Sequence, residues 1–150
     1  MIRAIQLALD NVRSLQGGPF GAVVVKDNDF VADGVNRVTS THDPTAHAEI
    51  VAIREACRKL RVFDLRGYDI YTSCEPCPMC LGAIYWARLS HVYFGAGAAD
   101  ASQAGFDDSV IYRELALPHA QRAIPMVQMM RDEALAAFRV WADQPNKTPY

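Results

Sequence analysis

The sequence predicts an α/β fold of three layers, α/β/α, in which helices cover both faces of a mixed sheet of roughly five strands. Short β-branched runs alternate with segments whose apolar residues recur every three or four positions, a pattern typical of strands alternating with amphipathic helices. The first two runs are joined by a turn and the later ones by helical segments, so an antiparallel hairpin should join parallel strands. At 150 residues, 51% of them hydrophobic, the chain can enclose one core, and we expect a single domain over residues 1–150.

Each expected element follows from a local pattern. Ile5, Leu9 and Val12 continue a three- and four-residue spacing that predicts a first helix, which Gly17-Gly18 ends. The expected elements are, in order, a helix over 3–15, strands over 20–26 and 30–37, a helix over 46–60, a strand over 69–73, a helix from about 77 to 86, a strand over 91–95, a small-residue loop over 98–105, a short helix over 107–115, an edge strand over 124–129 and a terminal helix over 131–142.

Residues with special backbone preferences place the turns and the helix starts. Asp27-Asn28-Asp29 has turn chemistry and separates the first two strands. A polar loop over residues 38–44 leads to Thr45, which we expect to be the N-cap of the second helix. Proline is tolerated before a helix or in its first turn, so Pro78 places the start of the third helix near Cys77.

Composition and charge narrow the possible partners. The longest apolar stretch falls short of the roughly 18 residues that a membrane span requires, so we expect no membrane partner. The net charge of −2 disfavours nucleic acid, whose binding depends on Lys and Arg at the phosphates, and favours a small-molecule substrate. The first residues lack the apolar core of a secretory signal, so we expect a cytoplasmic protein whose cysteines serve metal binding or catalysis. One basic cluster is interpreted as a solvated helix face: Arg54, Arg58, Lys59 and Arg61.

His47 and the pair Cys77 and Cys80 have the residue types and spacing of a catalytic zinc site. The two cysteines are three positions apart, so both sulfurs lie on one side of a first helical turn, where the helix dipole favours thiolates. His47 is near the start of the preceding helix, and two helix N-termini aimed at one point would supply three ligands. The fourth position would stay open for a water molecule whose pKa zinc lowers to about 7.

Glu49 is predicted to act beside the metal as a general acid and base. It follows His47 by two positions, which is roughly 200° around a helix, so the two side chains do not share one coordination geometry. A carboxylate beside the metal can accept the proton of the water and pass it to a substrate nitrogen. His-x-Glu followed by Pro-Cys-x-x-Cys is the combined signature of zinc nucleobase deaminases.

Other interpretations of these residues remain open. Taken alone, the cysteine pair could be a redox pair or half of a closed structural zinc site, which would make the chain a non-catalytic, zinc-stabilised binding module. Cys74 extends the motif to Cys-x-x-Cys-x-x-Cys, which could hold an iron–sulfur cluster. A fourth cysteine ligand is not obvious, since Cys57 falls on a predicted core face. We therefore interpret Cys74 as the end of a buried strand and Cys57 as a core residue.

Recognisable segments extend over nearly the whole chain: Gly17–Val23, Asn36, Asp43–Glu49, Thr72–Arg88, Ala104–Ser109, Ile111-Tyr112 and the terminal Tyr150. With these segments the chain resembles the cytidine-deaminase-like zinc superfamily, and within it the bacterial guanine deaminases. The zinc motif marks only the superfamily, whereas Ala104–Ser109, with its Phe-Asp-Asp-Ser run, and the terminal tyrosine resemble the guanine deaminase pattern.

The resemblance implies a reaction. In such an enzyme, zinc-bound hydroxide attacks C2 of guanine, Glu49 shuttles protons, and xanthine and ammonia are released. Asp108 would be a second proton carrier, because the amino group at C2 is flanked by two ring nitrogens and a single carboxylate must otherwise serve both nitrogen and leaving group.

The resemblance also implies how the substrate is held. Asn36 would hydrogen-bond the purine edge, Phe20 and Trp86 would shape the flat pocket or stack in it, and Ala48 and Tyr150 would complete the contacts.

For the assembly, the resemblance implies one zinc ion per subunit and a homodimer in which C-terminal segments, about residues 130–150, are exchanged so that the tail closes over the active site.

A tRNA adenosine deaminase is the alternative within the same chemistry. Such enzymes share the Asp-Pro-Thr-Ala-His-Ala-Glu segment but usually carry a basic C-terminal helix. In this chain the region from 131 to 143 has two arginines against three acidic residues, which favours the purine base over RNA.

Overall fold

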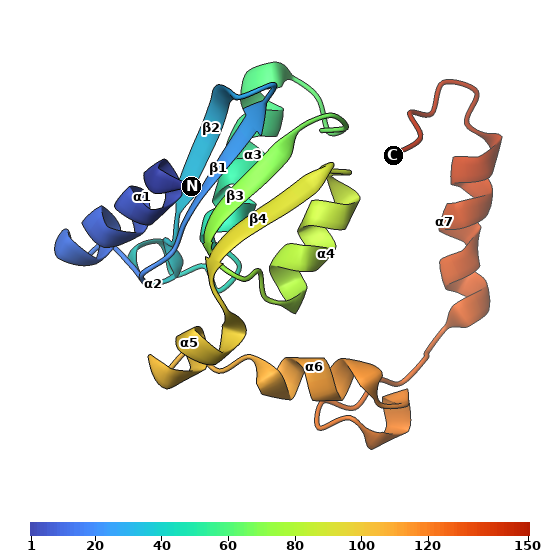
Figure 1. The fold of residues 1–150 in the computed structure, drawn as a ribbon. Coiled ribbons are helices and arrows are strands. Elements are labelled where there is room, and N and C mark those ends of the chain that lie inside the picture. The colour runs from blue at the N-terminus through green and yellow to red at the C-terminus, as the bar shows by residue number, and fades with distance from the viewer. The chain divides into compact units, whose positions relative to one another are not determined.

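The computed structural model describes all residues from 1 to 150, which form two compact units, Met1–Ser109 and Val110–Tyr150 (Figure 1). The first unit contains the sheet, and the second consists of helices joined by irregular segments. None of the helices is both long enough and apolar enough to cross a membrane.

Helices and strands alternate through the first unit after an opening hairpin, as the sequence predicts. The elements are α1 (Ile2–Arg13), β1 (Gly21–Lys26), β2 (Asp29–Val35), α2 (Val38–Thr41), α3 (Ala48–Leu60), β3 (Asp69–Cys74), α4 (Pro78–Trp86), β4 (His91–Ala96) and α5 (Ala98–Gln103).

The sheet has the strand order β2-β1-β3-β4. β1 pairs antiparallel with both β2 and β3, while β3 and β4 run parallel and are connected through α4. The predicted mixed sheet is therefore confirmed, but it has four strands and not five.

The missing strand is the segment 124–129, which was expected at a sheet edge. It lies in the second unit, after α6 (Ser109–Ala116) and the 3₁₀ helix η1 (His119–Gln121) and before α7 (Arg131–Asp143), and it has no regular structure. Ile124 and Val127 are 80% and 78% exposed. The apolar composition indicated a strand, but a strand also requires a neighbouring edge to pair with, and Pro125 removes one of the backbone donors.

Glycines allow helices to approach both faces of the sheet closely. Gly21 and Ala22 are neighbours in β1 and therefore point to opposite faces. A Cβ on Gly21 would lie 2.4 Å from the carbonyl oxygen of Ala4 in α1. On the other face, a Cβ on Gly34, which pairs with Ala22, would lie 2.4 Å from the carbonyl oxygen of Ala48 in α3. The sheet is thus covered by α1 on one face and α3 on the other.

The main core lies between the sheet and the helices α3 and α4. Its buried residues come from all of these elements and are mostly small or β-branched: Ala22, Val24, Ala32, Ala48, Ala52, Ile53, Ala56, Leu65, Ile70, Ile84 and Ala87. Because α4 contributes Ile84, and its C-cap residue Ala87, to the same cluster, α3 and α4 cover the same face of the sheet.

The helix α1 buries a different face from the one that its larger residues suggest. Ala4, Ala8 and Asn11 are buried against the sheet, whereas Ile5 and Leu9 are 43% and 46% exposed. Only small side chains fit where the α1 backbone approaches Gly21, so the larger apolar residues remain on the outer side.

Three local expectations were wrong in detail. The segment 38–44 contains the short helix α2, and the segment 98–105 contains α5, although both were expected to be loops. Helix α3 begins at Ala48, with His47 at the N-cap position, and not near Thr45. The Thr45 hydroxyl instead donates to Oδ1 of Asp43 over 2.7 Å, so it stabilises the preceding turn.

We predict that Gly34→Ala destabilises the protein, because the added methyl group would overlap the α3 backbone at Ala48. Overpacking of this kind lowers the free energy of unfolding by about 1–3 kcal/mol. Gly82→Ala is the matched control, since a Cβ on Gly82 meets nothing within 4 Å and alanine favours the helix. Urea unfolding of both zinc-loaded variants measures the difference, and equal midpoints would contradict the predicted close contact.

Candidate functional site

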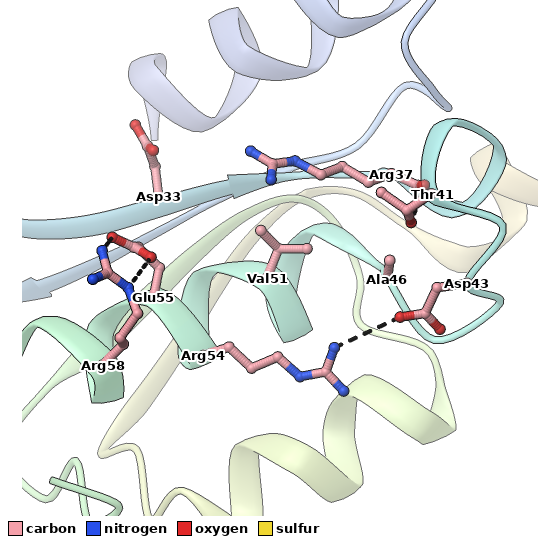
Figure 2. Close-up of a pocket in the computed structure, with 9 residues that line it drawn as sticks. All are labelled: Asp33, Arg37, Thr41, Asp43, Ala46, Val51, Arg54, Glu55 and Arg58. Carbon is pink, nitrogen blue, oxygen red and sulfur yellow. Dashed lines mark hydrogen bonds and ion pairs between the residues drawn. The ribbon is translucent and has the colours of Figure 1, made fainter. Parts of the chain in front are cut away.

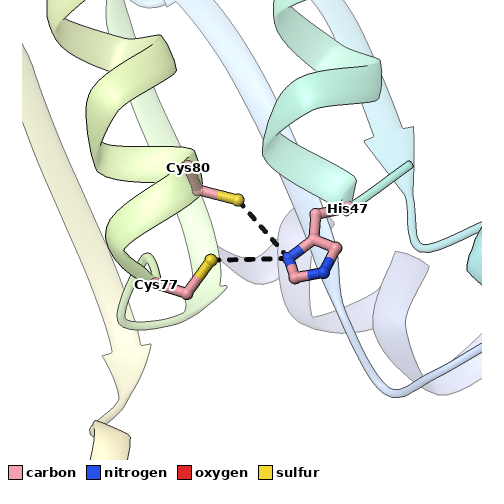
Figure 3. Close-up of side chains that lie close together, drawn as sticks. All are labelled: His47, Cys77 and Cys80. Atoms are coloured by element: carbon pink, nitrogen blue, oxygen red, sulfur yellow. Dashed lines mark hydrogen bonds between the residues drawn. The ribbon is translucent and has the colours of Figure 1, made fainter. Parts of the chain in front are cut away.

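His47, Cys77 and Cys80 converge between two helix N-termini (Figure 3). Their ligand atoms all lie within 4.8 Å of one another, and His47 Nδ1 is 3.6 Å from Sγ of Cys77 and 3.5 Å from Sγ of Cys80. His47 occupies the N-cap position of α3, and Cys77 occupies that of α4. The structure therefore brings together the three ligands that the sequence spacing predicts.

The local backbone explains why the ligands come from helix starts. Both N-cap residues are extended, with ψ of 157° at His47 and 169° at Cys77, and Pro78 then fixes the first residue of α4 in a helical conformation. The first amide groups of a helix have no partner within the helix, and together with the helix dipole they favour a thiolate at this end. The side chains of His47 and Cys77 therefore lie at the N-terminal ends of α3 and α4 and not along the sides of these helices.

The distances within the cluster fit a tetrahedral zinc ion. With Zn–S bonds of about 2.3 Å and Zn–N bonds of about 2.0–2.1 Å, tetrahedral geometry places nitrogen and sulfur ligands about 3.6 Å apart. The observed separations from His47 Nδ1 are 3.6 and 3.5 Å. One nitrogen and two sulfurs are ligands that zinc prefers, and three protein ligands leave one of four positions open.

The two cysteines differ in their affinity for a proton. A hydrogen bond from Cys80 lowers the pKa of Cys77 to about 4, and His47 stabilises this thiolate further. The same contact with Cys77, together with burial, raises the pKa of Cys80. Without metal, the pair thus keeps one proton, which must leave when both sulfurs bind a cation.

Glu49 lies beside the three ligands and is not one of them. It is 6% exposed, and burial raises the pKa of its carboxyl group. Its Oε2 accepts a hydrogen bond from Sγ of Cys80 over 3.4 Å, which places the carboxylate at the edge of the cluster. A buried carboxyl group with a raised pKa, next to a metal position, is suited to proton transfer near neutral pH.

Asn36 is buried just after β2 and is tightly held. Its Oδ1 accepts hydrogen bonds from the backbone amides of Gly18 and Val38, both over 3.3 Å, and its own amide donates to the carbonyl of Phe20 over 3.1 Å. Two amide donors at one atom identify that atom as the oxygen. Within the chain Nδ2 has no partner and remains able to donate.

Phe20 and Phe106 pack edge to face, with ring centroids 4.9 Å apart. This contact links the segment before β1 to the segment that carries Asp108. Burial raises the pKa of Asp108, and the negative charge of Cys77 raises it further, so Asp108 lies within electrostatic reach of the cluster. The sequence did not indicate a role for Phe106, since an aromatic residue in an irregular segment carries no periodic signal.

Three further residues, Ala48, Trp86 and Tyr150, were predicted from the sequence to contact the substrate. Ala48 is 1% exposed and lies between His47 and Glu49 in the first turn of α3. Trp86, at the end of α4, is 68% exposed. Tyr150 belongs to the second unit, where its ring packs edge-on against Trp141 with centroids 6.4 Å apart.

The other two cysteines lie outside the ligand cluster, as interpreted from the sequence. Cys74 is the buried last residue of β3, and its Sγ is 3.9 Å from the carbonyl oxygen of Gly97. Cys57 is partly buried and packs against the main core. Neither residue provides a ligand for a four-cysteine cluster.

Apart from the ligand cluster, a concave region of about 730 Å³ is lined by residues of β2, α2 and α3 and of the segments between them (Figure 2). Arg54 is 3.7 Å from the carboxylate of Asp43, and Arg58 pairs with Glu55, so two of its three arginines are neutralised locally. This confirms the basic cluster as an exposed helix face, and the charges there do not define a ligand.

Comparison with known proteins agrees with this geometry. Residues 1–96 match the family described as the cytidine and deoxycytidylate deaminase zinc-binding region. Guanine deaminase of Bacillus subtilis (strain 168) is 52% identical over 148 residues, covering 99% of this chain and 95% of that protein. The crystal structure of guanine deaminase from Bacillus subtilis has a TM-score of 0.96 at 52% identity, covering 99% of this chain and 94% of that one.

A more distant relative matches only part of the chain. A tRNA-specific adenosine deaminase of Aquifex aeolicus (strain VF5) is 44% identical over 78 residues, which are 52% of this chain and 52% of that protein.

The whole-length similarity confirms the cytidine-deaminase-like α/β fold, and the matched zinc-binding region contains His47, Cys77 and Cys80. The chain therefore belongs to the cytidine and deoxycytidylate deaminase family of zinc-binding proteins.

Proposed function

We propose that the protein is a zinc-dependent guanine deaminase, which hydrolyses guanine to xanthine and ammonia in cytoplasmic purine catabolism. The observation that carries the proposal is the 52% identity to a guanine deaminase over 99% of the chain, which includes the segments outside the zinc motif. One tRNA-specific adenosine deaminase is 44% identical over 52% of the chain and another is 38% identical over 70% of it, so that similarity is lower and less extensive.

His47, Cys77 and Cys80 would hold one zinc ion per subunit, which would supply a water molecule that is nucleophilic near neutral pH. Glu49 would accept a proton from this water as its oxygen bonds to C2 of guanine. It then gives the proton to N3, the ring nitrogen beside C2 that carries no hydrogen. The buried environment that raises the pKa of Glu49 favours both transfers, because the carboxyl group exchanges its proton easily.

Asp108 completes the reaction in this proposal. The amino group at C2 needs one more proton to leave as ammonia, and the new hydroxyl group must lose one to become the carbonyl of xanthine. A carboxyl group with a raised pKa can give the first proton and take the second, and so ends unchanged. Separate carriers for N3 and for the leaving group explain why two carboxylates lie near the cluster.

Asn36, Phe20 and Ala48 would hold the flat substrate. The Oδ1 atom of Asn36 is bound by backbone amides, so Nδ2 is the atom that can donate to an acceptor on the purine. The ring of Phe20, in contact with Phe106, would border the base, and Ala48, between His47 and Glu49, would complete the contacts. Trp86 and Tyr150 would complete the pocket in the assembled protein.

We further propose a homodimer in which the C-terminal segment, about residues 130–150, is exchanged between subunits. No residue from 110 to 150 is buried, and Phe138 and Val140 in α7 are 69% and 60% exposed. A segment with this apolar surface has no core of its own and needs another surface to cover it. Exchange of a terminal segment between identical subunits provides that cover at low cost.

A substrate panel tests the proposed activity. Zinc-loaded protein should convert guanine to xanthine and release ammonia in equal amounts, measured by ultraviolet absorbance and by coupled ammonia detection. The panel includes adenosine, cytosine and an anticodon stem-loop RNA. If guanine is not converted and the RNA is deaminated in a salt-sensitive way, the proposal is wrong and the protein is a tRNA adenosine deaminase.

Two carboxylate variants test the proton carriers. Glu49→Gln should lower kcat by at least about 10²–10⁴-fold, while Asp108→Asn should give a smaller loss, both with unchanged zinc content by metal analysis. Glu55→Gln on the same helix and Asp107→Asn beside Asp108 are the matched controls and should retain activity. Loss of zinc from Glu49→Gln would instead make Glu49 a structural residue.

Complementation between two inactive variants tests the exchanged tail. We expect that deletion of Tyr150 and the substitution Glu49→Gln each abolish activity alone. In co-expressed dimers with an exchanged tail, the Glu49→Gln subunit lends its intact tail to the other subunit, whose Glu49 is intact. Random pairing should then restore about a quarter of wild-type activity. If each tail serves its own subunit, no complete site forms, and the mixture stays inactive.

A further inference from the structure

Asn11 has a buried amide side chain in the last turn of α1, on the face of the helix that packs against the sheet. It is 4% exposed, and the other buried residues of α1 are Ala4 and Ala8. A buried polar side chain at such a position is costly unless its hydrogen bonds are satisfied. Neither the zinc chemistry nor the packing of α1 explains why an amide is present there.

The Nδ2 atom of Asn11 donates two hydrogen bonds that both end near the substrate-binding residues. One goes to the carbonyl oxygen of Gly18 and the other to the carbonyl oxygen of Asn36, each over 2.9 Å. One nitrogen with two hydrogens thus connects α1 to the loop before β1 and to the residue after β2. These segments are 7 and 25 positions away in the sequence.

The contacts around this nitrogen form a closed network. Asn11 binds the carbonyl group of Gly18, and the amide group of the same glycine donates to Oδ1 of Asn36. The amide of Asn36 then donates to the carbonyl of Phe20, and the carbonyl of Asn36 returns to Asn11. Both backbone and side chain of Asn36 are therefore fixed by a network that depends on Asn11.

The residues of this network are packed closely against one another. A Cβ on Gly17 would lie 2.1 Å from the carbonyl oxygen of Asn36 and 3.0 Å from Nδ2 of Asn11. The loop is therefore pressed directly against Asn36, and a small rotation of the Asn36 peptide group would move its side chain in the site.

We propose that Asn11 is a positioning residue for substrate binding, which acts through Asn36 and Phe20 and does not itself touch the substrate. The inference rests on the proposed function, because it assigns Asn36 and Phe20 to the purine. An amide is required at position 11 because a carboxylate cannot donate to either carbonyl when ionised and a hydroxyl can donate to only one. Loss of the donor releases the Gly18 loop and Asn36 together, and the substrate is then held less well before reaction.

The variant Asn11→Asp tests this inference, because it keeps the shape of the side chain and removes the donor. We expect the KM for guanine to rise by roughly tenfold or more, and kcat, calculated from the concentration of zinc-loaded subunits, to change less. Gln6→Glu is the matched control, since it makes the same chemical change on the exposed face of α1 and should leave KM unchanged. If the Asn11→Asp protein does not fold in sufficient amount to be assayed, Asn11→Ser is measured instead. Serine keeps one donor, so its rise in KM should be smaller than about tenfold.

Hydrogen exchange gives a readout that does not depend on activity. In the zinc-loaded variant, exchange should be faster at the amides of Gly18 and Asn36, while the amides of α4 keep their wild-type rates. Unchanged KM together with unchanged exchange at these amides would overturn the proposal. A lower melting temperature with general acceleration of exchange and an unchanged KM per bound zinc would reduce Asn11 to a residue of general stability.

These outcomes are separate from those of the proposed function. If the wild-type protein does not act on guanine, the proposed function fails, and the exchange measurement still decides whether Asn11 holds Asn36. If the wild-type protein deaminates guanine and Asn11→Asp behaves like Gln6→Glu, the function stands and the role of Asn11 is rejected.

Discussion

The close contact between β2 and α3 at Gly34 and Ala48 sets the geometry on which the site depends. The absence of a side chain at Gly34 lets the α3 backbone approach the strand to a distance at which a methyl group would not fit. Ala48 lies between His47 and Glu49, and Gly34 lies two residues before Asn36. One backbone contact therefore sets the distance from His47 and the proposed proton carrier Glu49 to the proposed purine-binding amide of Asn36.

The site combines two kinds of environment within a few residues. The hydrogen bond from Cys80 stabilises negative charge on Cys77, whereas burial of Glu49 disfavours negative charge there and raises the pKa of that carboxyl group. The ligands are thus held ready for a cation, while the neighbouring carboxyl group can still exchange a proton. Such a difference between adjacent acidic groups is what a hydrolytic deamination requires, because binding the metal and moving protons are separate tasks.

The parts of this arrangement that the sequence predicted are those that depend on local spacing. The zinc ligands and Glu49 were predictable because three-residue spacing and helix starts fix where side chains point. The segment 124–129 was misjudged because strand formation depends on a partner edge, which the chain's own propensity does not reveal. The buried face of α1 depends on its close approach to Gly21, and the role of Asn11 depends on its contacts with Gly18 and Asn36. These contacts join separate segments of the chain, so no periodic pattern in the sequence indicates them.

The position of His47 relative to the cysteines has a consequence for the order of assembly. Cys77 and Cys80 are neighbours on one helical turn, so they can meet a metal ion with almost no loss of chain entropy. His47 is 30 positions from Cys77, and the intervening chain contains β3, which lies between β1 and β4 in the sheet. The complete set of three ligands therefore forms only when the starts of α3 and α4 have come together, so tight metal binding reports a folded first unit.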